Sequence, residues 1–161
     1  MQTADKISPN REFPPSVHAY CRSSALCVSF AIDRGEKPTV VLEFAEKGHG
    51  SSYNWPEKLS FQLNQGELAE LCAFLRKPWT SHKWVHQSHP AAKALVIRHQ
   101  APNILFEISA GKRHVIVPVI PRDQYFIRNL LMSRLIEIQP SLPLAAHHES
   151  LDQLSHALAR K

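Results

Sequence analysis

The feature that most constrains this chain is a strand that runs directly into an amphipathic helix, and it occurs twice. The first copy is YNWPEKLSFQLNQGELAELCAFLR, Tyr53 to Arg76, and the second is RHVIVPVIPRDQYFIRNLLMSRLIEI, Arg113 to Ile138. Each helix follows a run of strands, so we expect strands and then a helix, twice. No sequence identity between the halves is visible, so the repeat is one of structure. This order favours a sheet-built binding platform over an active-site cleft.

Alternating apolar residues predict the strands. Leu95 and Ile97 should share one face while Arg98 points the other way, and Phe106 and Ile108 should point inward. Turn residues such as Ala110 to Lys112 separate neighbouring strands. The predicted strands cover residues 18–32, 39–45, 59–63, 83–87, 92–99, 103–109 and 113–119.

The helices follow from caps and from the helical period. Asn64 is expected to cap the first helix, with Glu67 completing a capping box, and Pro78 ends it. Its apolar stripe is Leu68, Leu71, Cys72 and Leu75. The second helix opens at Pro121 and Asp123, and its expected apolar positions are Phe126, Leu130, Leu131, Ile136 and Ile138. A third short helix is expected near the C-terminus, with Leu151, Leu154 and Leu158 on one side.

Length and composition indicate one globular domain with ragged ends. The chain has 161 residues, of which 43% are hydrophobic and 20% charged. We expect a mobile N-terminal arm over 1–16, a binding domain over 17–140, and a linker with a short helix over 141–161. No apolar run reaches the roughly 18 residues that a membrane span needs, and no signal core is visible. Three cysteines without framework spacing favour a cytoplasmic protein.

Positive charge gathers in the second half. The net charge is +5. Between Trp84 and Arg128, six basic residues face two acidic ones, a local excess of +4 (six minus two). A basic sheet of this kind attracts phosphates and makes binding sensitive to salt.

Catalytic and metal-binding motifs are not found. Of the ten histidines, His82, His86 and His89 lie close together in the sequence, but they match no zinc spacing, and CxxC and HExxH are missing. Cys72 lies on the apolar stripe of a helix and is expected in the core. There is no GxGxxG or Walker sequence. We therefore expect no catalytic residues, no metal, no cofactor and no enzymatic activity.

Several short segments, in order along the chain, resemble the Whirly single-stranded-DNA-binding proteins. YCRSSALCV (20–28) lies where that family carries a Lys-Gly-Lys-Ala-Ala-Leu strand, and Tyr53-Asn54-Trp55 resembles its Tyr-Asp-Trp segment. WVHQSHP, KALVI and Val117-Pro118-Val119 match a strand and turn, a Lys-Ser-Leu-Ser-Ile strand and a Val-Pro-Val segment. The resemblance covers roughly residues 18 to 138. The family's first-strand lysines are Cys21 and Ser23 here, so Arg22 is the only cation nearby.

The resemblance implies an α+β fold of two antiparallel four-stranded sheets, each followed by a helix that packs on the sheet of its own half. It also implies a homotetramer held by its helices, with single-stranded DNA along sheet edges of adjacent protomers. The family's plant members carry organelle-targeting peptides, and their lack here favours a bacterial cytoplasmic relative. The candidate nucleic-acid-binding residues carried over are Arg22, Ser23, Ser24, Tyr53, Trp55, Lys93 and Arg98. Charge alone adds Lys112 and Arg113 at the hairpin turn.

Three functions are consistent with these features. The first is a sequence-tolerant single-stranded-DNA-binding protein that acts in DNA maintenance or transcription regulation. The second is an RNA-binding or RNA-annealing protein on the same platform, because stacking and phosphate contacts serve both polymers. The third is a structural module whose sheets bind protein. Salt-weakened binding that prefers single strands would distinguish the first from the third.

Overall fold

Two antiparallel four-stranded sheets and three helices make up the described part of the chain. The computed structural model describes residues 13–160. The first sheet contains, in order, β1 (Ser16–Tyr20), β2 (Ser24–Ile32), β3 (Pro38–Glu46) and β4 (Leu59–Gln62), with a 3-10 turn η1 (Trp55–Glu57) before β4. The second contains β5 (Ser81–His86), β6 (Lys93–Gln100), β7 (Asn103–Ala110) and β8 (Arg113–Val119). The helices are α1 (Gln65–Arg76), α2 (Pro121–Ile138) and α3 (Leu144–Leu158).

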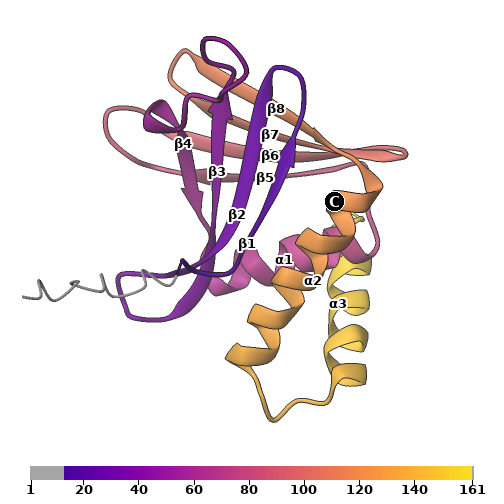
Figure 1. The fold of residues 1–161 in the computed structure, drawn as a ribbon. Helices are drawn as coiled ribbons and strands as arrows, with labels where there is room; N and C mark the ends of the chain where they lie inside the picture. Colours follow the sequence, from indigo (N-terminus) through magenta and orange to yellow (C-terminus); the bar gives the residue numbers. More distant parts are fainter. Residues whose placement is uncertain (1–12, 161) are drawn as a thin grey trace, which may run out of the picture.

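The predicted order of strands and helices is confirmed. α1 follows the first sheet and α2 follows the second, so the ββββα unit occurs twice. In Figure 1 the strands of the two sheets run in clearly different directions, and the three helices gather on one side of them. Of the predicted arm, residues 1–12 lie outside the described residues, and Ser16 already belongs to β1.

The predicted strand over 18–32 is wrong, because it is two strands joined by a tight turn. The Cys21 N–H donates to the Ser24 carbonyl at 2.9 Å, and the Lys47 N–H donates to the Ser23 carbonyl at 2.9 Å. β1 and β2 then pair antiparallel, with Ala19 opposite Leu26. The inward positions change from odd numbers (Val17, Ala19) to even numbers (Leu26, Val28) across the turn, because both strands bury the same face. No glycine or proline marks the break, so this shift in the alternation is the one local sign of it.

The inner faces of both sheets contribute to one hydrophobic core. Leu42 and Phe44 from β3 and Phe106 and Ile108 from β7 are fully buried in it. The predicted inward positions of Phe106 and Ile108, and the shared face of Leu95 and Ile97, are confirmed, since all four are completely inaccessible to solvent. Each fully buried side chain of this size contributes about 1.5–3 kcal/mol of transfer free energy.

α1 has the predicted cap and stripe. The Asn64 side chain accepts a hydrogen bond from the Glu67 N–H at 2.8 Å and donates to the Glu67 carboxylate at 2.6 Å. All four predicted stripe residues are buried: Leu68, Leu71, Cys72 and Leu75. Burial raises the pKa of the Cys72 thiol, as expected for a core cysteine.

α2 buries only part of the predicted stripe. Leu131 is buried as expected, and Leu130 and Ile138 are half-buried against the core, but Phe126 and Ile136 are exposed. The buried positions are Ile127, Leu131 and Arg134, which follow the helical period from i to i+4 and i+7. Apolar periodicity does not predict this buried stripe, because one of its three members, Arg134, is charged.

The helices also pack differently from the implied arrangement. α2 follows β8 but contacts β1, β2 and β3 of the first sheet, so it does not simply cover the sheet of its own half. α1 reaches β5 of the second sheet through Glu70, which accepts hydrogen bonds from the Trp84 indole at 2.9 Å and pairs with His82 at 2.8 Å. α3 lies against α1 through an ion pair between Arg76 and Asp152 at 2.7 Å. Each helix therefore joins parts of the chain that are distant in sequence.

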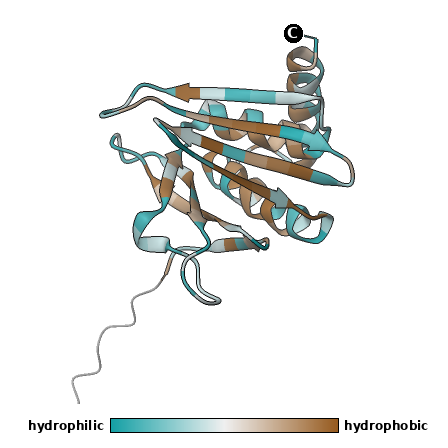
Figure 2. Cartoon of the chain, turned by 90° about the horizontal axis from the view of Figure 1, so that it is seen from above, coloured by the Kyte–Doolittle hydropathy of each residue, from teal (hydrophilic) through white to brown (hydrophobic). Residues whose placement is uncertain are grey.

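One face of the second sheet is turned away from the helices, as Figure 2 shows. Pairing in the sheet places Val96 beside Glu107, which lies opposite Ile116, so these residues share this outer face. Within residues 13–160, no helix is both long and apolar enough to cross a membrane.

Candidate nucleic-acid interface

Four aromatic rings form a continuous row on the outer face of the first sheet. His18 and Tyr20 are two residues apart on β1, so they point to the same side. Their rings stack with centroids 5.7 Å apart. The Trp55 ring meets His18 edge-on at 5.9 Å, and the Tyr53 ring lies 5.4 Å from Tyr20. We call His18, Tyr20, Tyr53 and Trp55 the aromatic row. Tyr20 is 57% exposed, so the row has surface free for a planar ligand.

The row is held in place by the β1–β2 turn. The Tyr53 hydroxyl donates to the Cys21 carbonyl at 2.6 Å. Tyr53 also forms an isolated bridge with Lys47, whose N–H donates to the Ser23 carbonyl. Arg22 and Ser23 lie in this turn and are exposed. The contacts therefore bring the turn cation Arg22 next to the row, from 31 positions before Tyr53 in the sequence.

Lys47 adds a second cation at the same place. Its ammonium lies 4.7 Å from the centroid of the Tyr53 ring and donates to the Ser51 carbonyl at 3.2 Å. Such a cation over an aromatic face is attracted by the ring quadrupole. Beside it lies an open pocket of about 600 Å³, lined by Lys47, Gly48, His49, Ser52, Tyr53, Asn54 and Pro56.

The turn between β7 and β8 brings the second sheet to the end of the row. Gly111 has φ +60°, a backbone conformation that favours glycine in tight turns. Arg113 pairs with Glu46 at 3.2 Å, and the Glu46 carbonyl accepts from the Asn54 N–H at 2.8 Å. Lys112 is exposed at the tip of the same turn.

We call the aromatic row together with Arg22, Ser23, Lys47, Lys112 and Arg113 the junction surface. It holds four cationic side chains, and Glu46 neutralises one of them. Six of the nine predicted site residues are brought together in it: Arg22, Ser23, Tyr53, Trp55, Lys112 and Arg113. A row of rings beside several cations can stack planar groups and neutralise phosphates at the same time.

Two predicted site residues, the buried Ser24 and the half-buried Lys93, bind the backbone of the other sheet. Ser24 is only 3% exposed, and its hydroxyl donates to the Ile116 carbonyl of β8. Lys93 donates from Nζ to the Ser60 carbonyl of β4 at 3.0 Å. Both side chains join the two sheets, which is a structural role for each.

Arg98 lies apart from the junction surface. It is near the other end of β6, paired in register with Ser81 and Leu105. Its guanidinium is 3.4 Å from the Glu107 carboxylate on the outer face of the second sheet. Any ligand that contacts both Arg98 and the aromatic row must therefore extend across two sheets.

Sequence reasoning missed His18, Tyr20 and Lys47. The alternation of His18 and Tyr20 on one face is visible in the sequence, but the predicted strand over 18–32 runs through the turn that follows them. The pairing of Lys47 with Tyr53 crosses a loop that contains two glycines, and no local pattern predicts it.

Cys21 lies in the same turn and has an unusual environment. Partial burial alone would raise the pKa of its thiol, but hydrogen bonds from Ser24 and from the backbone of Ser23 and Ser24 outweigh burial and lower it. The Cys21 sulfur is 3.0 Å from the Ser24 hydroxyl. Burial and the nearby Glu43 carboxylate instead raise the pKa of Cys27 to about 11.

His82 and His86, which lie close together in the sequence, are both paired with carboxylates of α1. His82 pairs with Glu70 at 2.8 Å, and His86 pairs with Glu67 at 2.9 Å. The His86 ring also stacks on Phe61 at 4.0 Å. Among residues 13–160, no group of three or more metal-ligating side chains is arranged to hold an ion.

Two crossed four-stranded sheets, each followed by a helix, define a Whirly-like fold. WHY1 and WHY3 from Arabidopsis thaliana share it with TM-scores of 0.66 and 0.65. WHY1 is 17% identical, over 78% of this chain and 91% of its own, and WHY3 is 16% identical, over 78% and 89%. The plant transcriptional regulator PBF-2 has a TM-score of 0.58 and 18% identity, over 80% of this chain and 96% of its own. No protein-family model and no curated protein matches the chain.

Proposed function

We propose that this protein is a homo-oligomeric, sequence-tolerant single-stranded-DNA-binding protein that acts in DNA maintenance or transcription. The observation that carries the proposal is the aromatic row flanked by Arg22, Lys47, Lys112 and Arg113. Stacking of a base on an aromatic ring contributes about 1–3 kcal/mol, and it tolerates any sequence because every base has a π-face. A structural neighbour is described as a plant transcriptional regulator, which supports a role in transcription.

The geometry favours single strands over duplexes. Rings that lie along a sheet surface can stack only on bases that are not paired and stacked in a helix. The cations gather near the Tyr53 end of the row, where Lys47 lies over the Tyr53 ring and Arg113 pairs with Glu46. There they can contact the phosphates between such bases. The same contacts are open to single-stranded RNA, so RNA is an outcome of the test below.

Self-association is part of the proposal, with a homotetramer as the expected state. Tyr125, Phe126 and Ile136 of α2 are 53%, 52% and 39% exposed. Tyr125 and Ile136 point to the same side of the helix, because eleven residues make about three turns, and the Phe126 ring meets the Tyr125 ring at 5.2 Å. A second copy that covers this side would remove large apolar side chains from water. A cytoplasmic location is also proposed, and the three unpaired cysteines favour it.

Fluorescence anisotropy tests the proposal. Labelled single-stranded DNA, the matched duplex and the matched single-stranded RNA are titrated with the protein at two salt concentrations. We expect the DNA single strand to bind most tightly and to lose affinity as salt rises. Tighter binding of RNA would favour the RNA-annealing alternative. Failure to bind all three would reject nucleic-acid binding and favour a module whose sheets bind protein.

A further inference from the structure

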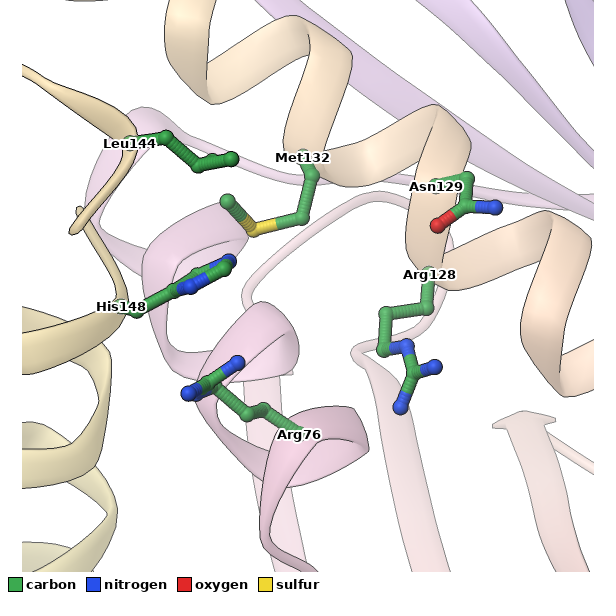
Figure 3. Close-up of a pocket in the computed structure, with 6 residues that line it drawn as sticks. All are labelled: Arg76, Arg128, Asn129, Met132, Leu144 and His148. Carbon is green, nitrogen blue, oxygen red and sulfur yellow. The ribbon is translucent and has the colours of Figure 1, made fainter.

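The three helices line a second pocket that lies apart from the junction surface. It has a volume of about 370 Å³ and is lined by Arg76, Arg128, Asn129, Met132, Leu144 and His148. In Figure 3, Arg76 and His148 lie on one side, Arg128 and Asn129 on the other, and Met132 and Leu144 close one end. The volume is near the small end of the ligand pockets found in proteins, about 300–1,000 Å³.

The polar lining of this pocket is able to donate hydrogen bonds and carries positive charge. Arg76 and Arg128 supply two guanidinium groups, and the amide of Asn129 and the ring of His148 supply further N–H donors. None of the six lining residues is acidic. A ligand that fits this lining is an anion with several acceptor oxygens.

The carboxylate that pairs with Arg76 also pairs with a second cation. Asp152 of α3 pairs with the Arg76 Nε at 2.7 Å and with the Lys77 ammonium at 3.3 Å. Hydrogen bonds from Arg76 lower the pKa of Asp152, so its single negative charge is shared between two cations. Within residues 13–160, Arg128 forms no ion pair. The positive charge at the pocket is therefore in excess.

The pocket also has an apolar end. The Met132 thioether and the Leu144 side chain lie together there (Figure 3). Methionine adapts its shape to flat or irregular groups and makes favourable contacts with aromatic rings. The ligand that matches both ends carries an anionic group on a compact apolar or aromatic body.

We propose that this pocket binds a small organic phosphate of mononucleotide size. The guanidinium groups of Arg76 and Arg128 bind the phosphate oxygens, since planar guanidinium forks match phosphate geometry. The aromatic body of the ligand lies against Met132 and Leu144. Because the ligand contacts α1, α2 and α3 at once, its binding stabilises the packing of the helices, and it does so without occupying the sheets.

Isothermal titration calorimetry of the full chain with adenosine monophosphate tests the site, with inorganic phosphate and adenosine as partial probes. We expect binding by the monophosphate, weaker binding by phosphate and none by adenosine. Arg128→Gln removes one guanidinium and should weaken the monophosphate about tenfold or more. Arg122→Gln is the matched control, because it removes the same charge from α2 outside the pocket and should change affinity by less than about twofold.

Three results would overturn the site. The first is no binding of the monophosphate at millimolar concentration. The second is equal weakening by the Arg128 and Arg122 substitutions, which would mean attraction to net charge only. The third is loss of monophosphate binding when single-stranded DNA saturates the protein, which would place the nucleotide on the junction surface. Unchanged binding of the monophosphate with DNA present supports the helical pocket. If the protein binds no DNA, the monophosphate titration and the comparison of the Arg128 and Arg122 variants still test the pocket.

Discussion

Arg134 of α2 donates a hydrogen bond from Nη2 to the carbonyl oxygen of Ala31 at 2.6 Å, across 103 positions of sequence. The same guanidinium donates from Nε to the Thr39 carbonyl at 2.9 Å and lies 4.3 Å from the centroid of the Phe30 ring. Glu137 pairs with its Nη1 at 2.8 Å. One buried cation thus fastens the helix of the second half to a hairpin of the first, and this contact explains why α2 lies against the first sheet.

Replacing this cation should destabilise the fold. Arg134→Met keeps much of the side-chain volume but leaves the Ala31 and Thr39 carbonyls without their donor. We expect a loss of about 2–4 kcal/mol in the free energy of unfolding, measured by urea denaturation. Arg128→Met, at an exposed position of the same helix, should change it by about 0.5 kcal/mol or less. Equal effects of the two substitutions would show that Arg134 does not fasten α2 to the hairpin.

Removing one ring of the aromatic row should weaken nucleic-acid binding without unfolding the protein. Tyr20→Ala removes an exposed ring, so we expect a loss of about 1–3 kcal/mol in binding free energy with little change in melting temperature. Trp55→Ala removes a partly exposed ring and should cost affinity and some stability together. Anisotropy and thermal melts of both variants check this. Unchanged DNA affinity for Tyr20→Ala would mean that bases do not stack on the row.

The positive charge of Arg22 next to the aromatic row should increase the salt dependence of DNA binding. Each phosphate contact on a single strand contributes about 0.7 to the slope of log K against log salt. Arg22→Gln is therefore expected to reduce the slope by about that amount. Arg34→Gln is the control, because Arg34 is also exposed but lies in the β2–β3 turn, at the opposite end of β2. A change of slope for both variants would point to net charge in place of a specific contact.

Cys21 should be the most reactive of the three cysteines. The thiolate is the nucleophile, so a lowered pKa lets the alkylation rate reach its plateau at a lower pH. Cys27, with a pKa of about 11, and the buried Cys72 should react slowly at neutral pH. Maleimide labelling followed by peptide mass spectrometry, repeated over a pH series, measures these rates. Ser24→Ala removes a hydrogen bond that lowers the Cys21 pKa, so its rate profile should shift to higher pH.

The same labelling reports on the proposed interface. Bound single-stranded DNA should slow the modification of Cys21, because Cys21 lies in the turn next to Arg22. Labelling at an equal rate with and without saturating DNA would place the DNA elsewhere.

The exposed apolar side of α2 should decide the oligomeric state. Phe126→Glu places a charge beside Tyr125 and Ile136, on the surface that a second copy of the chain is proposed to cover. We expect the oligomer to dissociate to smaller species, measured by light scattering. The side chain is exposed in one protomer, so the fold should persist by circular dichroism. Lys83→Glu on the second sheet is a control that should leave the assembly intact. An assembly that survives Phe126→Glu unchanged would be held by another surface.

Local patterns predicted those parts of the fold that depend on neighbouring residues. The cap at Asn64, the stripe of α1 and the inward faces of β6 and β7 follow from short periods, because the side chains that alternate along an element all meet one core. The same logic failed at the β1–β2 turn, where no glycine or proline marks the change of strand. It also failed on α2, where Arg134 occupies a position that apolar periodicity would assign to a hydrophobic residue.

The sequence identified several residues of the candidate site, but it did not predict how they lie relative to one another. Arg22 and Tyr53 were identified separately, and the hydrogen bond from Tyr53 to the Cys21 carbonyl brings them together. The family resemblance suggests Lys93 as a binding residue, and only the fold shows its ammonium bound to the Ser60 carbonyl. A sequence shows that a lysine is present, but its partner depends on which strands become neighbours.

The sequence by itself determined the order of strands and helices, the capped first helix and the excess of positive charge in the second half. The order and the cap depend on periodicity and on hydrogen bonds within a few residues, and the charge excess depends on composition alone. The tertiary structure decided which cations stand beside the aromatic row, that Ser24 and Lys93 join the sheets, and that α2 crosses to the first sheet. Those outcomes depend on contacts such as Arg134 with Ala31 and Arg113 with Glu46. Such contacts form only when distant segments share one core, so no local pattern of residues encodes them.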